Sequence, residues 1–453
     1  MTLFEVLSSF RDQEVLVSGD SGEWTAQDLL SRAELHRSKL SGRRVAIQLA
    51  EPSDGIVALL AADGQAEAIT LLPPTLSKET LQVLSEQSES DLLIGGPLDS
   101  ESNPKKIECY TSLDLVPEQT ADPDKNAQPT KWNLATSGTT KSPRLVSHSL
   151  AGLTRTTKRK EEPSADNRWG LLYDYTRFAG LQVVLQSLFS ASSLIVPSPH
   201  VSLAEKIALL VGEACTHLSA TPSLWRAIVM TPCARDLPLR QITLGGEIAD
   251  VRILSTLKEM YPNARITQIY ASTETGVGFS VNDGLPGFPA SYLQDAPNGI
   301  GLRLFDGRLQ IKKTEVKRAY VGTSERISDE EGWINTCDDV EIIGDRVFFL
   351  GRANGVINVG GNKVHPEEIE SLLCDHPLVR SARVFGKPNP IMGTLVAAEV
   401  VPNEEINDER LFSEKLKNDL RGSVPAFKVP VSVTVVDQIE ITSTGKISRA
   451  KTK

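Results

Sequence analysis

The chain has 453 residues, of which 40% are hydrophobic, and its 48 basic and 58 acidic residues give a net charge of −10. This length allows two or three domains with a large core, and the acidic balance argues against a surface that binds nucleic acid or an anionic membrane. The five cysteines form no CxxC pair, so we expect a cytoplasmic location and neither a disulfide framework nor a zinc site. The sequence shows no signal-peptide pattern and no apolar run long enough for a membrane span.

Between residues 43 and 270, short apolar runs typical of strands alternate with segments of helical period. Examples are RRVAIQLA before GIVALLAADGQ, and RQITLGG before DVRILSTLKEMY. This alternation predicts an α/β architecture with largely parallel sheets. Ligands of such sheets bind at the carboxyl ends of the strands.

The composition changes at three places along the chain. Residues 97–130 are polar and rich in proline, which predicts a loop between subdomains. From Gly278 to Gly351, glycines and short alternating strands predict a small β-subdomain. After Gly351, the segments HPEEIESLLCDHP, VRSARVFG, TLVAAEVV and DERLFSEKLKNDLRG predict a compact α+β domain. We therefore predict a large N-terminal domain over residues 1–352 and a small C-terminal domain over residues 353–453.

A loop rich in hydroxyl groups, ATSGTTKSPR at 135–144, lies between the apolar strands KWNLA and RLVSH. Its hydroxyls, the small Gly138 and the charges of Lys141 and Arg144 suit a polyphosphate. It is no Walker loop, because the spacing GxxxxGKS/T is absent. Taken alone, the segment is more typical of a Ser/Thr-rich surface turn.

Five further segments follow in a fixed order. They are ITLGGE at 242–247, QIYASTETG at 268–276, GWINTCDD at 332–339, GRANGVINVGGNKVHPEEIE at 351–370 and ITSTGKISR at 441–449. Together with the loop, they resemble the acyl-adenylate-forming superfamily of acyl- and aryl-CoA ligases, peptide-synthetase adenylation domains and luciferases. ATSGTTKSPR is similar to the family's TSGTTGxPKG, YASTE to YGxTE, NTCD to TGD, and STGKISR to TxxGKxxR.

The resemblance implies ATP and Mg²⁺ as cofactors and assigns a role to each motif. The residues implied for the ATP phosphates are Thr136, Ser137, Gly138, Thr139, Thr140 and Arg144. Glu274 would bind Mg²⁺, which prefers carboxylate and phosphate oxygens, and Thr273 would contact the α-phosphate. The residues implied to border adenine are Gly245, Gly246, Glu247, Tyr270 and Ala271. Asp338 would accept hydrogen bonds from the ribose hydroxyls, and Arg352 would support ribose or phosphate.

Lys446 is implied as the catalytic residue of the first step, together with Thr273 and Glu274. An ammonium that contacts both the substrate carboxylate and the α-phosphate offsets their repulsion in the transition state. Without the other motifs, STGK would be a turn with a solvated lysine.

The resemblance also implies that the small C-terminal domain swings between two orientations. The pivot falls at Asn354, and Gly360 and Gly361 would line a tunnel for the phosphopantetheine arm. The segment NVGGNK is also typical of a hairpin turn, and the two interpretations are compatible.

The acyl pocket is expected to involve LYDYTRFAGLQ at 172–182. Its predicted residues are Tyr175, Arg177, Phe178, Gly180 and Leu244. Arg177 stands where relatives often have His or an aromatic residue. If it faces the pocket, it favours a polar or anionic acid; if it faces solvent, it has no bearing on the substrate.

The chain departs from the family pattern at four positions. Lys141, Ala271 and Cys337 stand where Gly is common, and Arg144 replaces Lys. Because Glu274, Asp338 and Lys446 are all present, we predict an ATP-dependent acid–CoA ligase that forms acyl-AMP and pyrophosphate, then a thioester with coenzyme A. The alternatives are an enzyme that loads an acyl or aminoacyl group onto the phosphopantetheine of an acyl carrier protein, and an inactive nucleotide-binding relative. The expected partner is a small carboxylic acid, and the expected state is a monomer or homodimer.

Overall fold

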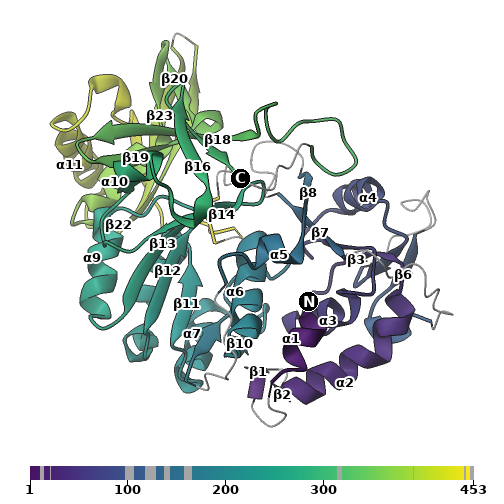
Figure 1. The fold of residues 1–453 in the computed structure, drawn as a ribbon. Coiled ribbons are helices and arrows are strands. Elements are labelled where there is room, and N and C mark those ends of the chain that lie inside the picture. The colour runs from purple at the N-terminus through teal and green to yellow at the C-terminus, as the bar shows by residue number, and fades with distance from the viewer. Residues whose placement is uncertain are drawn as a thin grey trace.

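The computed structural model is shown in Figure 1. It describes residues 1–10, 15–20, 22–96, 107–117, 129–136, 143–157, 166–313, 319–390, 392–442 and 445–448. Within these residues, no helix combines the length and the apolar character needed to cross a membrane.

A six-stranded sheet lies in the first part of the chain. Its order is β6 (Glu108–Tyr110), β5 (Leu92–Ile94), β3 (Arg44–Ile47), β4 (Ala68–Leu71), β7 (Lys131–Ala135) and β8 (Leu145–His148). All neighbours are parallel except β7 and β8. The helices that precede or connect its strands are α1 (Leu3–Leu7), α2 (Ala26–Arg37), α3 (Pro52–Ala62) and α4 (Lys78–Gln87). All four residues of β4 are buried, as expected for a strand covered on both faces.

An eight-stranded sheet forms the second layer. Its order is β14 (Gly276–Val281), β13 (Arg265–Ser272), β12 (Gln241–Gly245), β11 (His217–Ala220), β9 (Arg168–Gly170), β10 (Ser193–Val196), β1 (Val15–Gly19) and β2 (Gly22–Thr25). The strands from β13 to β1 are parallel, and β14 and β2 are antiparallel edges. The helices of this part are α5 (Leu150–Leu153), α6 (Phe178–Phe189), α7 (Leu203–Gly212), α8 (Pro222–Val229) and α9 (Val251–Met260). The predicted α/β architecture is confirmed.

The predicted β-subdomain is an antiparallel sheet of five strands. Its order is β15 (Phe288–Pro289), β19 (Arg346–Arg352), β18 (Trp333–Ile343), β17 (Arg308–Lys312) and β16 (Gly301–Phe305). Its buried residues, which include Phe288 and Val347, form one cluster with Phe279 of β14. This cluster joins the subdomain to the eight-stranded sheet.

The C-terminal domain is α+β, as predicted. Its strands are β21 (Asn362–Val364), β20 (Ile357–Val359), β23 (Gly393–Pro402), β22 (Val379–Asn389) and β24 (Ser432–Val435), and its helices are α10 (Pro366–Asp375) and α11 (Glu409–Arg421). The strand β19 ends at Arg352, and a turn at Ala353–Gly355 leads into β20. The predicted boundary at residues 352 and 353 falls between these two elements and stays a prediction.

Local chemistry explains several helix starts. The Ser202 side chain accepts a hydrogen bond from the backbone N–H of Glu205, and the Glu205 side chain accepts one from the backbone N–H of Ser202. The helix α7 therefore begins with a capping box. Pro366 occupies the first turn of α10, where a missing N–H costs nothing.

The prediction of a loop over residues 97–130 was wrong at β6, which pairs with β5. Three residues are too few for a period to be recognised in the sequence.

Candidate active site

The carboxyl ends of three neighbouring parallel strands form the floor of the site. The strands are β11, β12 and β13, and the chain leaves them at Thr221, Gly246 and Thr273. A turn over residues 273–275 then returns the chain into β14 and carries Glu274. Three motifs that are separate in the sequence therefore meet at one edge of the sheet.

Lys446 reaches this edge from the C-terminal domain. The hydroxyl of Thr221 donates to the carbonyl of Gly445, and the backbone N–H of Ile447 donates to Oε1 of Glu247 at 3.0 Å. The residues on both sides of Lys446 are thus held by the N-terminal domain. Its side chain runs along Gly246, where an added Cβ would lie 3.2 Å from Lys446 Cε.

Lys446 interacts electrostatically with other residues that the sequence predicts for the site. Burial lowers the pKa of its ammonium, and the positive charge of Arg352 lowers it further. The carboxylates of Glu247, Asp338 and Glu274 act in the opposite direction. The structure therefore brings Lys446 together with four residues that the sequence had singled out.

Asp338 lies in a short polar network on β18. It accepts a hydrogen bond from the Tyr270 hydroxyl, and its Oδ1 lies 3.2 Å from Nε of Arg352. Burial raises the pKa of its carboxyl, against the effect of Arg352, Tyr270 and Lys446. A carboxylate has about four lone-pair positions, so these two contacts leave acceptor capacity for ribose hydroxyls. The Tyr270 ring packs against Phe279 and Phe349, with centroids 5.1 and 5.2 Å away.

Glu274 faces a cluster that the sequence did not predict. The Tyr320 hydroxyl lies 3.4 Å from Glu274 Oε1. The guanidinium of Arg144 lies 4.1 Å above the Tyr320 ring and is ion-paired with Glu325. Arg144 is thus placed next to Glu274, the carboxylate predicted to bind Mg²⁺. Its guanidinium is already ion-paired with a different carboxylate, that of Glu325.

The described ends of the predicted phosphate loop are joined to each other. The N–H of Thr136 donates to the carbonyl of Arg144 at 2.8 Å, and the N–H of Arg144 donates to Thr136 Oγ1 at 3.0 Å. These bonds close the base of the loop. Ser137, Gly138, Thr139 and Thr140 lie outside the described residues.

Mg²⁺ fits Glu274 as a ligand shared with the nucleotide. Within the described residues, no three or more His, Cys, Asp or Glu side chains are grouped so that they could hold a metal ion. Mg²⁺ bound to a nucleotide commonly uses one or two protein carboxylates, with phosphate oxygens and water completing its shell. The partly buried Glu274, at the sheet edge beside Arg144, matches this donor set.

Comparison with known families agrees with this geometry. The family model described as AMP-binding enzyme matches residues 4–323, and the model described as AMP-binding enzyme C-terminal domain matches residues 368–446. The first match covers more than half of the chain. The chain belongs to the AMP-binding enzyme family.

Individual relatives of this AMP-binding enzyme are distant. A plipastatin synthase protein of Bacillus subtilis is 23% identical over 99% of this chain and 19% of its own length. The oxalate–CoA ligase of Saccharomyces cerevisiae is 26% identical over 70% of this chain and 61% of its own length. The chain therefore matches less than two thirds of either relative. The solved structure of the anthranilate CoA ligase AuaEII with anthranoyl-AMP has a TM-score of 0.82 at 16% identity, covering 99% of this chain and 96% of that one, which indicates a shared fold.

Three of the residues predicted for the acyl pocket of this AMP-binding enzyme are closely packed against other parts of the chain. Tyr175 is 1% exposed and its hydroxyl donates to the carbonyl of Leu49 at 2.8 Å, and Leu244 is also 1% exposed. Both side chains pack in the core, and their place in the acyl pocket stays a prediction. An added Cβ on Gly180 would lie 2.1 Å from the Asp174 carbonyl, so this glycine permits a close backbone approach.

The acyl-pocket roles of Phe178 and Arg177 also stay predictions. Phe178 packs beside the turn that carries Glu274, because an added Cβ on Gly276 would lie 3.8 Å from its ring. Arg177 is mostly buried, with Asp174 at 3.9 Å as its ion-pair partner. Burial lowers the pKa of its guanidinium, and Asp174 opposes this effect.

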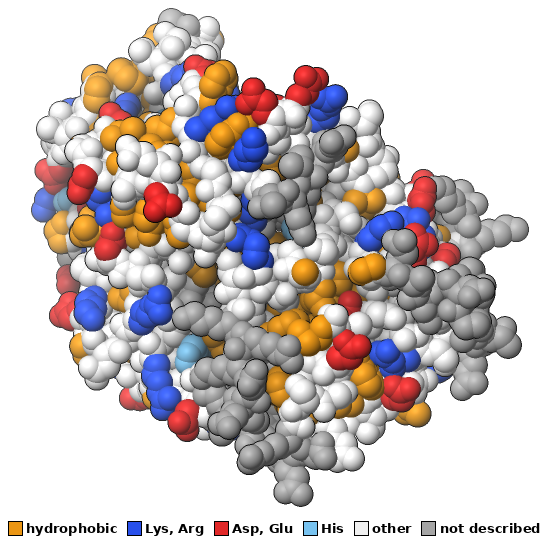
Figure 2. Space-filling model, viewed as in Figure 1, with side chains coloured by type: hydrophobic (Ala, Val, Ile, Leu, Met, Phe, Trp, Pro, Cys, Tyr) orange, Lys and Arg blue, Asp and Glu red, His pale blue; other side chains and the backbone are white. Residues whose placement is uncertain are grey.

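Basic side chains missed by the sequence analysis also border the turn that carries Glu274. Arg155 and Lys313 both donate to the carbonyl of Val277, in β14. Figure 2 shows Lys and Arg side chains near the centre of the face that it draws. An added Cβ on Gly276 would lie 3.1 Å from Lys313 Nζ. Neither residue belongs to a recognisable motif, so the sequence carried no signal for them.

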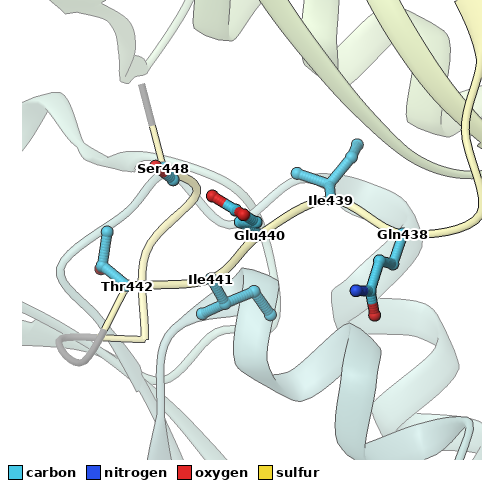
Figure 3. A pocket seen from close by; sticks show the side chains of 6 residues that line it. All are labelled: Gln438, Ile439, Glu440, Ile441, Thr442 and Ser448. Atoms are coloured by element: carbon cyan, nitrogen blue, oxygen red, sulfur yellow. The ribbon is translucent and has the colours of Figure 1, made fainter. Parts of the chain in front are cut away.

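A surface cavity lies behind the loop that carries Lys446. Its volume is about 420 Å³, and its lining residues are Gln438, Ile439, Glu440, Ile441, Thr442 and Ser448 (Figure 3). All six belong to the segment that leads to and from Lys446, and none is predicted to bind ATP. The cavity is therefore a feature of the segment around Lys446.

The glycine pair predicted for the tunnel forms the turn between β20 and β21. Gly360 and Gly361 have φ values of +57° and +92°, and β20 pairs antiparallel with β21. The hairpin interpretation is confirmed. Figure 1 places β20 at the outer edge of the molecule, whereas β12 and β13 lie inside it. Asn354, the predicted pivot, is exposed in the turn after β19.

Proposed function

We propose that this AMP-binding enzyme is an ATP- and Mg²⁺-dependent acid–CoA ligase. The observation that carries the proposal is the placement of Lys446. Thr221 and Glu247 hold the backbone on both sides of it, beside Glu274 and Asp338. This is the arrangement needed to bring a carboxylate to the α-phosphate of ATP.

In the proposed first step, a carboxylate oxygen of the acid attacks the α-phosphorus, and the bond to the bridging oxygen breaks, releasing pyrophosphate. The Lys446 ammonium contacts both anions and stabilises the charge that spreads between them. Asp338 and Arg352 orient the ribose. Glu274 would hold Mg²⁺, which supplies neutralisation of phosphate charge when bound.

In the proposed second step, the thiolate of coenzyme A attacks the acyl carbon of acyl-AMP and AMP leaves. The hairpin of Gly360 and Gly361 lies away from the sheet edge in the present orientation. The C-terminal domain must therefore turn about the segment near Asn354 before this hairpin can accompany the pantetheine arm.

A second candidate acceptor is the phosphopantetheine of a carrier protein. The match to the plipastatin synthase protein, which extends over 99% of this chain, favours this alternative. Both acceptors present the same arm, so the first step is common to the two.

Pyrophosphate release with ATP and a panel of acids tests the proposal. We expect release with at least one acid, and thioester formation when coenzyme A is added. Lys446→Ala should lower the adenylation rate at least about 100-fold while sparing acyl transfer from supplied acyl-AMP, and Lys415→Ala, an exposed lysine on α11, should leave both steps unchanged.

Three other outcomes would contradict parts of the proposal. Thioester that appears only with a holo carrier protein would assign the second acceptor. Background release with every acid, unchanged in Lys446→Ala, would indicate an inactive nucleotide-binding relative. Equal loss of both half-reactions in Lys446→Ala would argue against a change of domain orientation between them.

A further inference from the structure

Arg252 on α9 connects the N-terminal domain to the backbone of the C-terminal domain. Its Nη1 donates to the carbonyl of Cys374, to that of His376 at 2.8 Å and to that of Val379 at 3.0 Å. These carbonyls lie where α10 ends and β22 begins. One side chain thus contacts three backbone acceptors of the other domain.

The end of α10 is a strong acceptor for a cation. The last carbonyls of a helix have no partner within it and carry the negative end of its dipole. The last turn of α10 contains no basic residue of its own. Arg252 therefore supplies, from the other domain, the positive charge that commonly caps a helix at this position.

The charged groups around Arg252 make this contact polar. Asp250 caps the start of α9 and forms an ion pair with Arg226. Across the interface, the pKa of Asp375 is raised by burial and by Asp250, and lowered by Arg226 and Arg252. A polar contact of this kind can open and close without exposing a large apolar surface.

The contacts of Arg252 are distinct from those of the catalytic loop. Thr221 and Glu247 hold the backbone beside Lys446 directly. Arg252 contacts only the end of α10 and the start of β22 through the hydrogen bonds described above. Its effect on Lys446 must therefore pass through the position of the whole C-terminal domain.

We propose that Arg252 is a positioning residue that holds the C-terminal domain in the orientation in which Lys446 faces the active site, and thereby favours adenylation over thioester formation. This inference rests on the proposed function. The domain cannot turn away unless the hydrogen bonds of Arg252 break, so their loss shifts the population toward other orientations.

Arg252→Met tests the inference, because methionine keeps much of the side-chain length and removes the charged donors. We expect pyrophosphate release in the first turnover to slow at least about tenfold, because the charge-assisted hydrogen bonds of Arg252 to three carbonyls are lost. Thioester formation from supplied acyl-AMP and coenzyme A should be unchanged or faster. Arg252→Lys, which keeps the charge, should recover part of the first rate. Arg265→Met, at an exposed arginine that begins β13, is the matched control.

Hydrogen exchange of the ligand-free protein separates this inference from the proposed function. In Arg252→Met, we expect faster exchange at the Ile447 amide, which donates to Glu247, and at the end of α10, with an unchanged melting temperature. This result would support the positioning role even if no acid were adenylated by the unmodified protein. Unchanged exchange at Ile447, or equal slowing of both half-reactions, would overturn it.

Discussion

Cys337 occupies a backbone conformation that favours glycine. Its φ is +60°, and it lies directly before Asp338 inside β18, where the pairing with β17 is irregular. Its N–H donates to Asn335 Oδ1 at 2.9 Å, which fixes the backbone of this irregular part of the strand. A side chain with left-handed backbone costs about 1–2 kcal/mol, so this position stores strain next to a residue predicted to bind ribose.

Replacing Cys337 with glycine should therefore stabilise the protein. The relief of strain is partly offset by the greater freedom of glycine in the unfolded chain, so we expect a gain of roughly 0.5–1 kcal/mol in the free energy of unfolding. Denaturant unfolding of Cys337→Gly measures it. Cys233→Gly, at a position without positive φ, should give no gain, and a loss in Cys337→Gly would contradict the strain argument.

The lowered pKa of Lys446 predicts a pH dependence of adenylation. The side chain must be protonated to contact both anions. Burial and the charge of Arg352 lower its pKa below the ordinary lysine value of about 10.4. We expect kcat/KM of adenylation to fall as pH rises toward that value, reporting the free enzyme. Lys446→Arg should lose this alkaline limb, since guanidinium stays charged. A limb that persists in Lys446→Arg would assign the titration to another group.

The site residues that belong to sequence motifs could be predicted from the sequence. The residues that contact them in the folded structure could not. Lys446, Asp338 and Glu274 stand at recognisable spacings, and the structure brings them together. Thr221 and Tyr320 are a lone threonine and a lone tyrosine without a motif. Their contacts depend on how distant segments meet, which spacing along the chain does not encode.

At the scale of elements, α3 is packed more tightly than its sequence suggests. An added Cβ on Gly55 would lie 2.2 Å from the Tyr175 ring. This contact explains why a tyrosine predicted for the acyl pocket is enclosed by the core. The 3.6-residue period of the helix could be predicted, but its partner across the core could not.

Gly55→Ala should destabilise the protein by about 1–3 kcal/mol through overpacking. Gly212→Ala is the matched comparison, because Gly212 ends α7 with nothing within 4 Å of an added Cβ. We expect this second change to be neutral or slightly stabilising, since alanine favours helix by up to about 1 kcal/mol. Thermal unfolding of both variants measures the difference, and equal effects would show that Tyr175 can move aside.

At the scale of the whole molecule, the proposed nucleotide site uses groups from every part of the chain. Glu247 and Glu274 come from the eight-stranded sheet, Asp338 from the β-subdomain and Lys446 from the C-terminal domain. The α/β and α+β classes of these parts were predictable from periodicity. Their relative orientation was not, because it depends on side-chain contacts such as those of Glu247 and Arg252.

Nucleotide binding should consequently stabilise the assembled molecule. At 100 times its Kd, ATP with Mg²⁺ is expected to add about 2.7 kcal/mol and raise Tm. Asp338→Ala should abolish most of this rise in Tm, because it removes the predicted acceptor for the ribose hydroxyls. Asp345→Ala, in the turn after β18, is the control and should retain the rise. Thermal scans with and without ATP measure both, and a full shift in Asp338→Ala would place the ribose elsewhere.

The pairing of Arg144 with Glu325 over the Tyr320 ring has a consequence for anion binding. A ligand that takes this guanidinium must displace a carboxylate, and because the two side chains of the pair are partly exposed, the ion pair that is lost is worth about 1 kcal/mol or less. A polyphosphate brings several charges and forked oxygens to the same group. In the proposed function, binding of ATP would therefore exchange the Glu325 carboxylate for phosphate oxygens at this guanidinium.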